Sequence, residues 1–495
     1  MSPKMVAPPT NLHFVLFPLM AQGHLVPMVD IARILAQRGA TVTIITTPYD
    51  ANRVRPVISR AIATNLKIQL LELQLRSTEA GLPEGCESFD QLPSFEYWKN
   101  ISTAIHLLQQ PAEDLLRELS PPPDCIISDF WFPWTTDVAR RLNIPRLVFN
   151  GKGCFYPLCM HVAITSNILG ENEPVSSNTE RVVLPGLPDR IEVTKLQILG
   201  SSRPANVDEM GSWLRAVEAE KASFGIVVNT FEELEPEYVE EYKTVKDKKM
   251  WCIGPVSLCN KTGPDLAERG NKAAITEHNC LKWLDERKLG SVLYVCLGSL
   301  ARISTAQAIE LGLGLESINR PFIWCVRNET DELKTWFLDG FEERVRDRGL
   351  IVHGWAPQVL ILSHPTIGGF LTHCGWNSTI ESITAGVPMI TWPFFADQFL
   401  NEAFIVEVLK IGVRIGVERA CSFGEEDKVG VLVKKEDVKK AVECLMDEDE
   451  DGDQRRKRVI ELAKMAKIAM AEGGSSYENV SSLIRDVTET VRAPH

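Results

Sequence analysis

The sequence predicts an α/β protein made of two doubly wound halves, and three observations carry this prediction. At 495 residues, the chain is too long for one compact core. Short apolar runs of strand length alternate with helical patterns in both halves, as in units that build parallel sheets. A polar stretch of low hydrophobicity at 259–276 separates the two series. We therefore expect two domains joined by a linker.

The N-terminal half begins with an apolar run at 12–17, a loop reading PLMAQGH, and a helical pattern over 25–38. Gly39 follows that pattern at the position where glycine commonly ends a helix. The β-branched run at 41–46 then completes the start of a β-α-β unit. Further buried strands of the same parallel sheet are expected at 67–73, 125–128, 146–150 and 225–231.

The C-terminal half repeats this alternation. We expect its strands at 291–297, 322–326, 350–353, 367–371 and 388–392, with helices between them. A last helical apolar pattern covers 475–491. Ligands of such sheets bind at the carboxyl ends of strands and favour domain interfaces, so the loops after these strands are the first places to search.

Composition narrows the classes of function. A net charge of −13 argues against a nucleic-acid or anionic-membrane partner. No apolar run approaches the roughly 18 to 20 residues of a membrane span, and the first ten residues read as a loose tail without the apolar core of a signal peptide. Twelve cysteines lack a CxxC pair or zinc spacing, which favours reduced thiols and a cytoplasmic protein.

A strand, a glycine turn and the start of a helix follow one another at 367–378. Such a helix start presents unpaired amides and about half a positive charge, so it suits an anion. His373, Asn377 and Ser378 can each donate a hydrogen bond to a diphosphate oxygen. The alternative is that Asn377 and Ser378 only cap the helix. No DxD-like metal pair accompanies them, so we expect no metal.

The stretch from Trp355 to Gln398 contains these residues and reads WAPQVLILSHPTIGGFLTHCGWNSTIESITAGVPMITWPFFADQ. It resembles the signature box of plant family-1 UDP-sugar glycosyltransferases, and the resemblance extends over nearly the whole chain. It implies a GT-B fold, in which two Rossmann-like domains face each other across a cleft. It further implies an acceptor-binding domain at 1–255, a UDP-sugar-binding domain at 256–474, and a helix at 475–495 that crosses back to the first domain.

The resemblance assigns the box residues to parts of the donor. Trp355 stacks on uracil, Gln358 reaches the ribose, and Trp376, Asp397 and Gln398 meet the sugar, with Gln398 pointing to glucose. For both tryptophans the alternative is core packing. The complete set of donor-binding residues expected is Ser299, Trp355, Ala356, Gln358, His373, Trp376, Asn377, Ser378, Glu381, Asp397 and Gln398.

Glu381 has two interpretations. Ser378 and Glu381 have the spacing of a capping box, which would make the carboxylate a helix cap. The resemblance instead assigns Glu381 to the ribose hydroxyls, and we favour that role.

His24 and Asp129 are the candidate catalytic residues. Each follows an apolar strand of the N-terminal half, and strand-end loops of one sheet can bring them together. Histidine suits a base near neutral pH, and an aspartate can orient its imidazole. A His-Asp pair alone is more often structural, but both positions match the family's catalytic dyad. The implied reaction is one displacement that inverts the sugar's configuration.

The expected activity is that of an inverting UDP-glucose O-glucosyltransferase, acting as a monomer without a cofactor. Its acceptor would be a hydroxyl, or a carboxyl, of a bulky plant compound such as a triterpenoid, steroid or flavonoid. This subgroup is indicated by MAQGHLVPMVDIARILAQRG, ITTPYDANR, LPGLPDRIEVTKLQ and GEEDKVGVLVKKEDVKKAV. One departure is Phe423, where relatives carry Trp, in a loop expected near the donor cleft. The acceptor pocket is expected from 83–98, 130–134, 153–160 and 184–198.

Three alternatives are weaker. Another donor, such as UDP-glucuronic acid, UDP-galactose or UDP-xylose, would keep the fold and mechanism, although a carboxylated sugar requires a cation near C6 that the sequence does not identify. A non-catalytic sugar-nucleotide-binding protein predicts a decayed His24, Asp129 or HCGWNS, and all are intact. A dinucleotide dehydrogenase is excluded because no GxGxxG follows the first strand.

Overall fold

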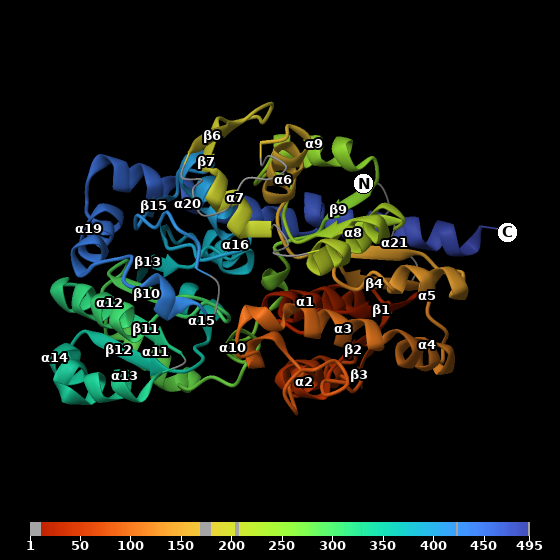
Figure 1. The fold of residues 1–495 in the computed structure, drawn as a ribbon, viewed down its shortest axis with the longest axis horizontal. Helices are drawn as coiled ribbons and strands as arrows, with labels where there is room; N and C mark the ends of the chain where they lie inside the picture. The colour runs from red at the N-terminus through yellow and green to blue at the C-terminus, as the bar shows by residue number, and fades with distance from the viewer. Residues whose placement is uncertain (1–10, 169–179, 203–206, 328, 422–423, 494–495) are drawn as a thin grey trace, which may run out of the picture.

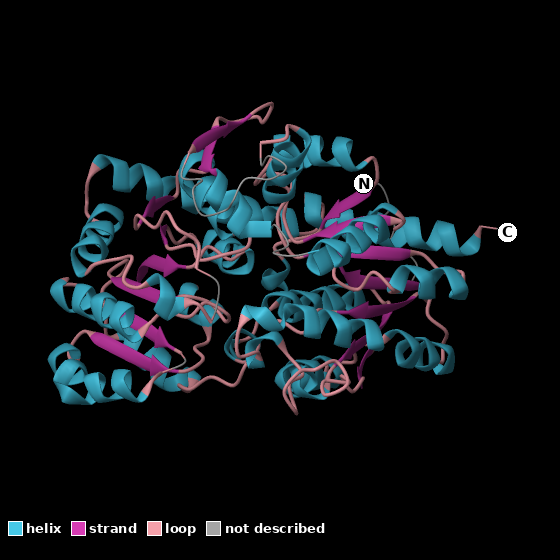
Figure 2. Ribbon diagram, in the orientation of Figure 1, coloured by secondary structure: helices cyan, strands magenta, loops and turns pink. Residues whose placement is uncertain are grey.

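The protein folds into two α/β domains that lie side by side (Figure 1). The computed structural model describes residues 11–168, 180–202, 207–327, 329–421 and 424–493. The starting tail and Phe423 therefore lie outside the described residues. In both halves a central sheet is flanked by helices, as the magenta strands and cyan helices of Figure 2 show.

The N-terminal domain contains a seven-stranded, fully parallel sheet in the order β3-β2-β1-β4-β5-β8-β9. Its strands are β1 (His13–Phe17), β2 (Thr41–Thr46), β3 (Ile68–Glu72), β4 (Cys125–Asp129), β5 (Arg146–Asn150), β8 (Gly225–Val228) and β9 (Lys249–Cys252). Its helices are α1 (Gln22–Gln37), α2 (Pro48–Ala63), α3 (Trp98–Leu107), α4 (Gln109–Glu118), α5 (Thr135–Leu142), α6 (Phe155–Thr165), α7 (Lys195–Ser202), α8 (Val207–Lys221) and α9 (Pro236–Lys246).

The C-terminal domain contains a six-stranded, fully parallel sheet in the order β12-β11-β10-β13-β14-β15. Its strands are β10 (Val292–Cys296), β11 (Phe322–Val326), β12 (Gly349–His353), β13 (Ile367–Thr372), β14 (Met389–Thr391) and β15 (Gly412–Arg414). Its helices, with those of the linker and the C-terminus, are α10 (Gly263–Ala267), α11 (Glu277–Asp285), α12 (Thr305–Ser317), α13 (Asp331–Trp336), α14 (Glu342–Val345), α15 (Gln358–Leu362), α16 (Trp376–Ala385), α17 (Gln398–Ala403), α18 (Glu426–Val429), α19 (Lys435–Met446), α20 (Glu450–Met470) and α21 (Ser475–Arg492).

The predicted α/β class and the parallel pairing are confirmed, and each expected strand is present with small shifts of its ends. The expected strand at 225–231 is too long, because β8 ends at Val228 and the side chain of Asn229 accepts a hydrogen bond from the amide of Val256. The edge strands β9 and β15 were not predicted, since three or four residues are too few to establish a period. The antiparallel hairpin β6 (Arg181–Leu184) and β7 (Ile191–Thr194) was also missed.

Helix α1 begins earlier than its apolar pattern indicates, which corrects the position of His24. The expected helix began at residue 25, but α1 begins at Gln22, so His24 lies in its first turn and not in the preceding loop. Ala21 has extended backbone angles at the N-cap and its carbonyl accepts from the amide of Leu25 at 2.9 Å. The first turn is polar and apolar periodicity therefore does not reveal it.

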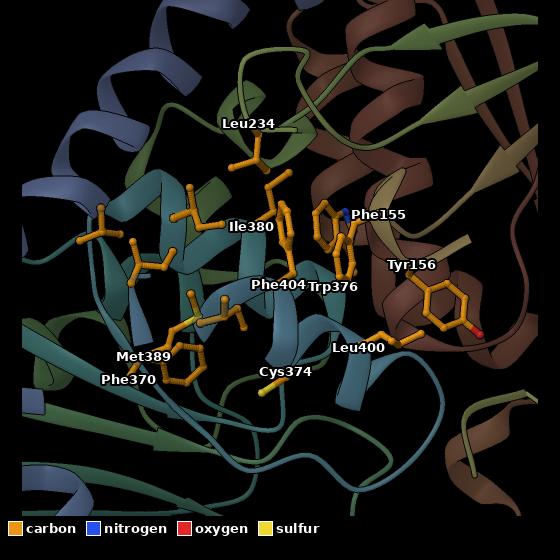
Figure 3. Packing of buried hydrophobic residues seen from close by; sticks show 14 of the residues in the cluster. Phe155, Tyr156, Leu234, Phe370, Cys374, Trp376, Ile380, Met389, Leu400 and Phe404 are labelled. Carbon is orange, nitrogen blue, oxygen red and sulfur yellow. The ribbon is translucent and has the colours of Figure 1, made fainter. Parts of the chain in front are cut away.

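The two domains share part of one core. A cluster of buried residues joins Phe155 and Tyr156 of the N-terminal half to Trp376, Leu400 and Phe404 of the C-terminal half (Figure 3). Phe155 and Phe404 lie with ring centroids 4.9 Å apart. This continuous apolar contact fixes the carboxyl ends of the two sheets against each other, and the polar residues discussed below lie around it.

Helix α21 packs on the N-terminal domain although it follows the C-terminal domain in sequence (Figure 1). Its apolar residues Val480, Leu483, Ile484 and Val487 belong to the core beneath β9 and α1. At its start, Ser476 donates to the carbonyl of Gly254. The described part of the chain contains no helix long and apolar enough to cross a membrane.

Candidate active site

His24 and Asp129 meet at the carboxyl ends of neighbouring strands. Strands β1 and β4 pair directly, and His24 Nδ1 lies 2.6 Å from Asp129 Oδ2. The Asp129 side chain is 1% exposed, whereas that of His24 is 28% exposed. Asp129 Oδ1 also accepts a hydrogen bond from the amide of Trp131 at 3.1 Å. With Nδ1 engaged, Nε2 is the ring atom of His24 that can take a proton from a ligand.

Pro27 leaves one backbone carbonyl in the first turn of α1 without its helical hydrogen bond, and the other domain uses that carbonyl. Proline has no N–H, so the carbonyl of Gly23 has no helical donor four residues later. That carbonyl instead accepts a hydrogen bond from Asn377 Nδ2, in the first turn of α16. The helix that carries His24 is thereby attached to the predicted diphosphate loop. Asn377 Oδ1 in turn accepts from Asn229 at 3.4 Å.

A cavity of about 410 Å³ lies at the carboxyl ends of β10, β11 and β12. Two predicted donor residues line it, Ser299 after β10 and Trp355 after β12. Asp90 of the N-terminal domain also lines the cavity, so the cavity lies between the two domains. Ala356, the next residue of the box, is buried and does not line the cavity.

His373 lies against the glycine turns beside this cavity. A Cβ added at Gly298 or Gly375 would come within 2.4 Å of its imidazole, so both positions require glycine. Burial, with the nearby charge of Arg327, lowers the pKa of His373 to about 4. His373 is therefore neutral near pH 7 and can donate one hydrogen bond. Its Nδ1 is buried and has no partner among the described residues.

The contacts of Glu381 exclude the capping-box interpretation. Helix α16 begins at Trp376 and its N-cap is Gly375, so Ser378 lies inside the helix. Gln358 Nε2 donates to Ser378 Oγ at 3.0 Å and to Glu381 Oε2 at 2.8 Å. The predicted residues Gln358, Ser378 and Glu381 thus form one cluster. For the same reason Asn377 and Ser378 are not helix caps.

Arg269 connects that cluster to α1, the helix that carries His24, and no sequence motif indicated this residue. Its guanidinium pairs with Glu381 and donates to Asp30 Oδ2 of α1 at 2.6 and 2.9 Å. Burial disfavours its charge, but Asp30 and Glu381 outweigh that effect and raise the pKa of Arg269 above its ordinary value. Arg269 lies in the polar linker. In such a stretch the sequence does not distinguish a buried arginine from a solvated one.

The two tryptophans of the box have different surroundings. Trp376 is 3% exposed, and its Nε1 donates to the carbonyl of Asn229 at 2.8 Å within the shared core (Figure 3). The indole therefore lies in the core, as the core-packing alternative predicts. Trp355 is half-buried and borders the cavity, where the guanidinium carbon of Arg327 lies 4.4 Å from its ring centroid.

Asp397 and Gln398 are buried at the start of α17. Gln398 Oε1 accepts from the amides of Phe394 and Phe395 at 2.8 and 3.2 Å. Asp397 Oδ2 accepts from Asn401 at 2.7 Å. These bonds fix both side chains, and Gln398 Nε2 is left as the donor that a ligand hydroxyl can meet.

Lys152 is a second residue that the sequence did not reveal. It follows β5 in the glycine-flanked loop 151–153, where a Cβ added at Gly151 would lie 3.5 Å from His24 Nδ1. Its ammonium lies 4.1 Å from the ring centroid of Tyr156. Burial opposes its charge, but Tyr156, Asp397 and Asp129 raise the pKa of Lys152 overall. Lys152 is therefore a cation on which the charges of Asp397 and Asp129 both act.

Two doubly wound domains define the class of GT-B glycosyltransferases, here with a His-Asp pair in one domain and, in the other, a glycine turn and helix start that Asn377 joins to the helix of that pair. Family models agree over both halves: "Glycosyltransferase, N-terminal domain" matches residues 10–258, and "UDP-glucoronosyl and UDP-glucosyl transferase" matches residues 281–450. The chain belongs to the plant family-1 UDP-glycosyltransferases and is a transferase.

Relatives support the assignment over the full length. The chain is 98% identical over 495 residues to UDP-glycosyltransferase 73E1 of Stevia rebaudiana, with both chains fully covered. It is 53% identical over 489 residues to UDP-glycosyltransferase 73C11 of Barbarea vulgaris, covering 97% of each chain.

Solved structures share the fold. UGT73P12 of Glycyrrhiza uralensis, complexed with glycyrrhetinic acid 3-O-monoglucuronide, is 37% identical, with a TM-score of 0.89 and coverage of 97% of this chain and 96% of that chain. Phytolacca americana UGT2, complexed with UDP-2fluoro-glucose and pterostilbene, is 26% identical, with a TM-score of 0.78 and coverage of 97% and 100%.

Proposed function

We propose that this enzyme is an inverting UDP-glucose-dependent O-glucosyltransferase that acts on a hydroxyl of a bulky apolar plant compound and gives a β-glucoside. The observation that carries the proposal is the 2.6 Å contact of His24 with the buried Asp129, beside a loop suited to a sugar diphosphate. The donor, the acceptor and the roles of the site residues are all part of this proposal.

His24 acts as the general base. Asp129 holds Nδ1, so Nε2 removes the acceptor proton while the acceptor oxygen attacks the anomeric carbon from the face opposite UDP. The negative charge of the side chain of Asp129 then stabilises the imidazolium. Because one displacement inverts configuration, an α-linked donor gives a β-linked product.

The donor is held by the C-terminal domain. Trp355 stacks on uracil, the cluster of Gln358 and Glu381 meets the ribose, and the start of α16 with neutral His373 receives the diphosphate. Ser299 adds a diphosphate contact. The fixed amide of Gln398 donates to a sugar hydroxyl, with Asp397 as acceptor.

The acceptor binds among aromatic side chains of the N-terminal domain. Trp98 and Trp131 lie with centroids 4.8 Å apart, and Phe95 stacks on Trp98. These rings remain partly exposed, and the backbone of Trp131 is bonded to Asp129. An apolar ring system against them would bring its hydroxyl near His24. UGT73P12 was solved with glycyrrhetinic acid 3-O-monoglucuronide and UGT2 with pterostilbene.

A second donor, UDP-glucuronic acid, is supported by Lys152. A carboxylated sugar requires a cation near C6. Lys152 is a cation, and its pKa is raised in part by the charge of Asp397, which is the proposed sugar contact. The UGT73P12 complex contains a glucuronide, which is a property of that protein. We rank UDP-glucose first because Gln398 matches the glucose form of the family's box.

Mass spectrometry of products tests the proposal. The protein is incubated with UDP-glucose, UDP-glucuronic acid, UDP-galactose or UDP-xylose and a mixed library of plant aglycones. We expect a hexose adduct on a subset of bulky alcohols with UDP-glucose. Faster transfer of glucuronic acid, abolished by Lys152→Gln, would establish the second donor; no transfer of any sugar would refute the proposal.

We further propose that the reaction needs no metal and that the enzyme is a cytoplasmic monomer. Among the described residues no group of three or more His, Cys, Asp or Glu side chains could hold a metal ion. None of the twelve cysteines is in a disulfide, which supports a reducing compartment. Transfer in excess EDTA tests the first statement, and size-exclusion chromatography tests the monomer.

A further inference from the structure

Arg327 introduces a positive charge into the cavity of the donor half-site. It directly follows β11, and it lines the cavity of about 410 Å³ together with Ser299 and Trp355. None of the contacts described above for the donor uses it.

The carboxylates around Arg327 are engaged elsewhere. Glu329, which also lines the cavity, contacts His353 Nδ1 at 2.5 Å, and Asp331 pairs with Lys334 at 3.1 Å. Within the described part of the chain no carboxylate forms an ion pair with Arg327. Its Nε is buried and has no partner there. A half-buried guanidinium with spare donors is a ready site for an anion.

Its position lies between the two ends of the expected nucleotide. On one side its guanidinium carbon is 4.4 Å from the ring centroid of Trp355, the uracil residue. On the other side its charge acts on His373, the diphosphate residue. Arginine can stack on an aromatic ring and donate bidentate hydrogen bonds to phosphate, so it suits this position better than lysine would.

We propose that Arg327 contacts the diphosphate of the UDP-sugar and neutralises the charge of the departing UDP. This inference rests on the proposed function. In the reaction the bond from the anomeric carbon to the diphosphate oxygen breaks, and its electron pair stays on that oxygen. The acceptor oxygen forms the new bond, and its proton passes to His24. Arg327 is a catalytic residue in this step, because the charge it faces grows as UDP leaves.

Binding of uridine and UDP, measured by titration calorimetry at constant ionic strength, separates a phosphate contact from a structural one. For Arg327→Gln we expect UDP affinity to fall about 10- to 100-fold, as for loss of hydrogen bonds to a charged group, while uridine affinity changes less than about threefold. Arg327→Lys retains the charge and should recover part of the UDP affinity. The turnover number with UDP-glucose should fall in Arg327→Gln.

Equal losses of uridine and UDP affinity would mean that Arg327 only supports Trp355, and they would overturn the inference. Unchanged UDP affinity in Arg327→Gln would overturn it as well. Arg344→Gln is the matched control, because Arg344 carries the same charge in the same domain but pairs with Glu316 at the surface. If the wild-type protein itself fails to bind UDP, the proposed function fails, and that result is distinguishable from both outcomes above.

Discussion

The side chains of His24 and Gln398 are held in place in the same way. In each side chain a first polar atom is bound by the protein, His24 Nδ1 by Asp129 and Gln398 Oε1 by two backbone amides. The bound atom fixes the tautomer or the orientation, and the remaining nitrogen, Nε2 in both side chains, is the atom proposed to meet the substrate. Preorganised groups of this kind stabilise a transition state without reorganising during the reaction.

At this scale Asp129→Asn is the sharpest change to the dyad. Asparagine keeps the shape but cannot hold the imidazole in the same tautomer or stabilise its charge. We expect the turnover number to fall roughly 10²- to 10⁴-fold, with UDP affinity within about twofold of wild type. Initial rates and calorimetry measure the two quantities. Turnover close to wild type would show that Asp129 does not act through His24.

Trp355 and Gln398 should affect different quantities. Trp355→Ala removes the stacking surface of the base, so we expect mainly weaker UDP affinity, by about 1 to 3 kcal/mol. Gln398→Ala removes a sugar donor, so transfer should weaken while UDP affinity stays largely intact. Calorimetry with UDP and steady-state rates with UDP-glucose separate the two. Equal effects of both variants on both quantities would contradict this division.

At the scale of elements, the start of α1 binds the other domain one residue from His24. Pro27 leaves the carbonyl of Gly23 without its helical partner, and Asn377 of α16 uses that carbonyl. A residue usually regarded as a helix breaker therefore supplies an interdomain contact one residue from His24. The same turn explains why apolar periodicity placed the helix start too late.

Pro27→Ala restores an N–H that competes with Asn377 for the Gly23 carbonyl. We expect kcat/KM for UDP-glucose to fall about 3- to 10-fold, equivalent to one modest hydrogen bond, without loss of thermal stability. Pro56→Ala is the matched control, because Pro56 also lies inside a helix, α2, which carries neither His24 nor Asp129. An equal fall in kcat/KM in both variants would argue against the interdomain role.

At the scale of the whole molecule, buried charges and a shared apolar core hold the domains together. Asp30 of α1, Arg269 of the linker and Glu381 of α16 form one continuous network of ion pairs. Beyond it, α21 returns to the N-terminal domain, where Asp486 accepts from Lys249 and Trp251. The proposed ribose contact is thus connected to the helix that carries the proposed base, His24.

Arg269→Met leaves two buried carboxylates unpaired. Breaking a buried ion pair by removing one partner costs about 3 to 5 kcal/mol, so we expect a loss of that order in the free energy of unfolding. Urea denaturation followed by fluorescence measures it. Arg344→Gln, at an exposed pair, should change stability far less. A loss for Arg269→Met no larger than for this control would show that the network does not stabilise the interface.

Much of the fold and part of the site could be predicted because their patterns are local. Buried strands of five residues can be recognised as short apolar runs in the sequence. The box from Trp355 to Gln398 can be recognised by its fixed spacing. The His24–Asp129 contact was also predicted, since the ends of adjacent parallel strands meet at one edge. Three features were not predicted: the short edge strands, the start of α1 and the core position of the Trp376 indole. Packing against distant segments decides each of them.

By itself the sequence determined the parallel α/β class, the family and the candidate dyad, since strand periods and motif spacings depend on neighbouring residues. Only the tertiary structure decided the partners of Arg269, Arg327 and Lys152. Each is one charged residue in an unremarkable stretch, and its environment comes from residues far along the chain. A charge acquires its function from the distance and burial of its partners, and folding alone sets both.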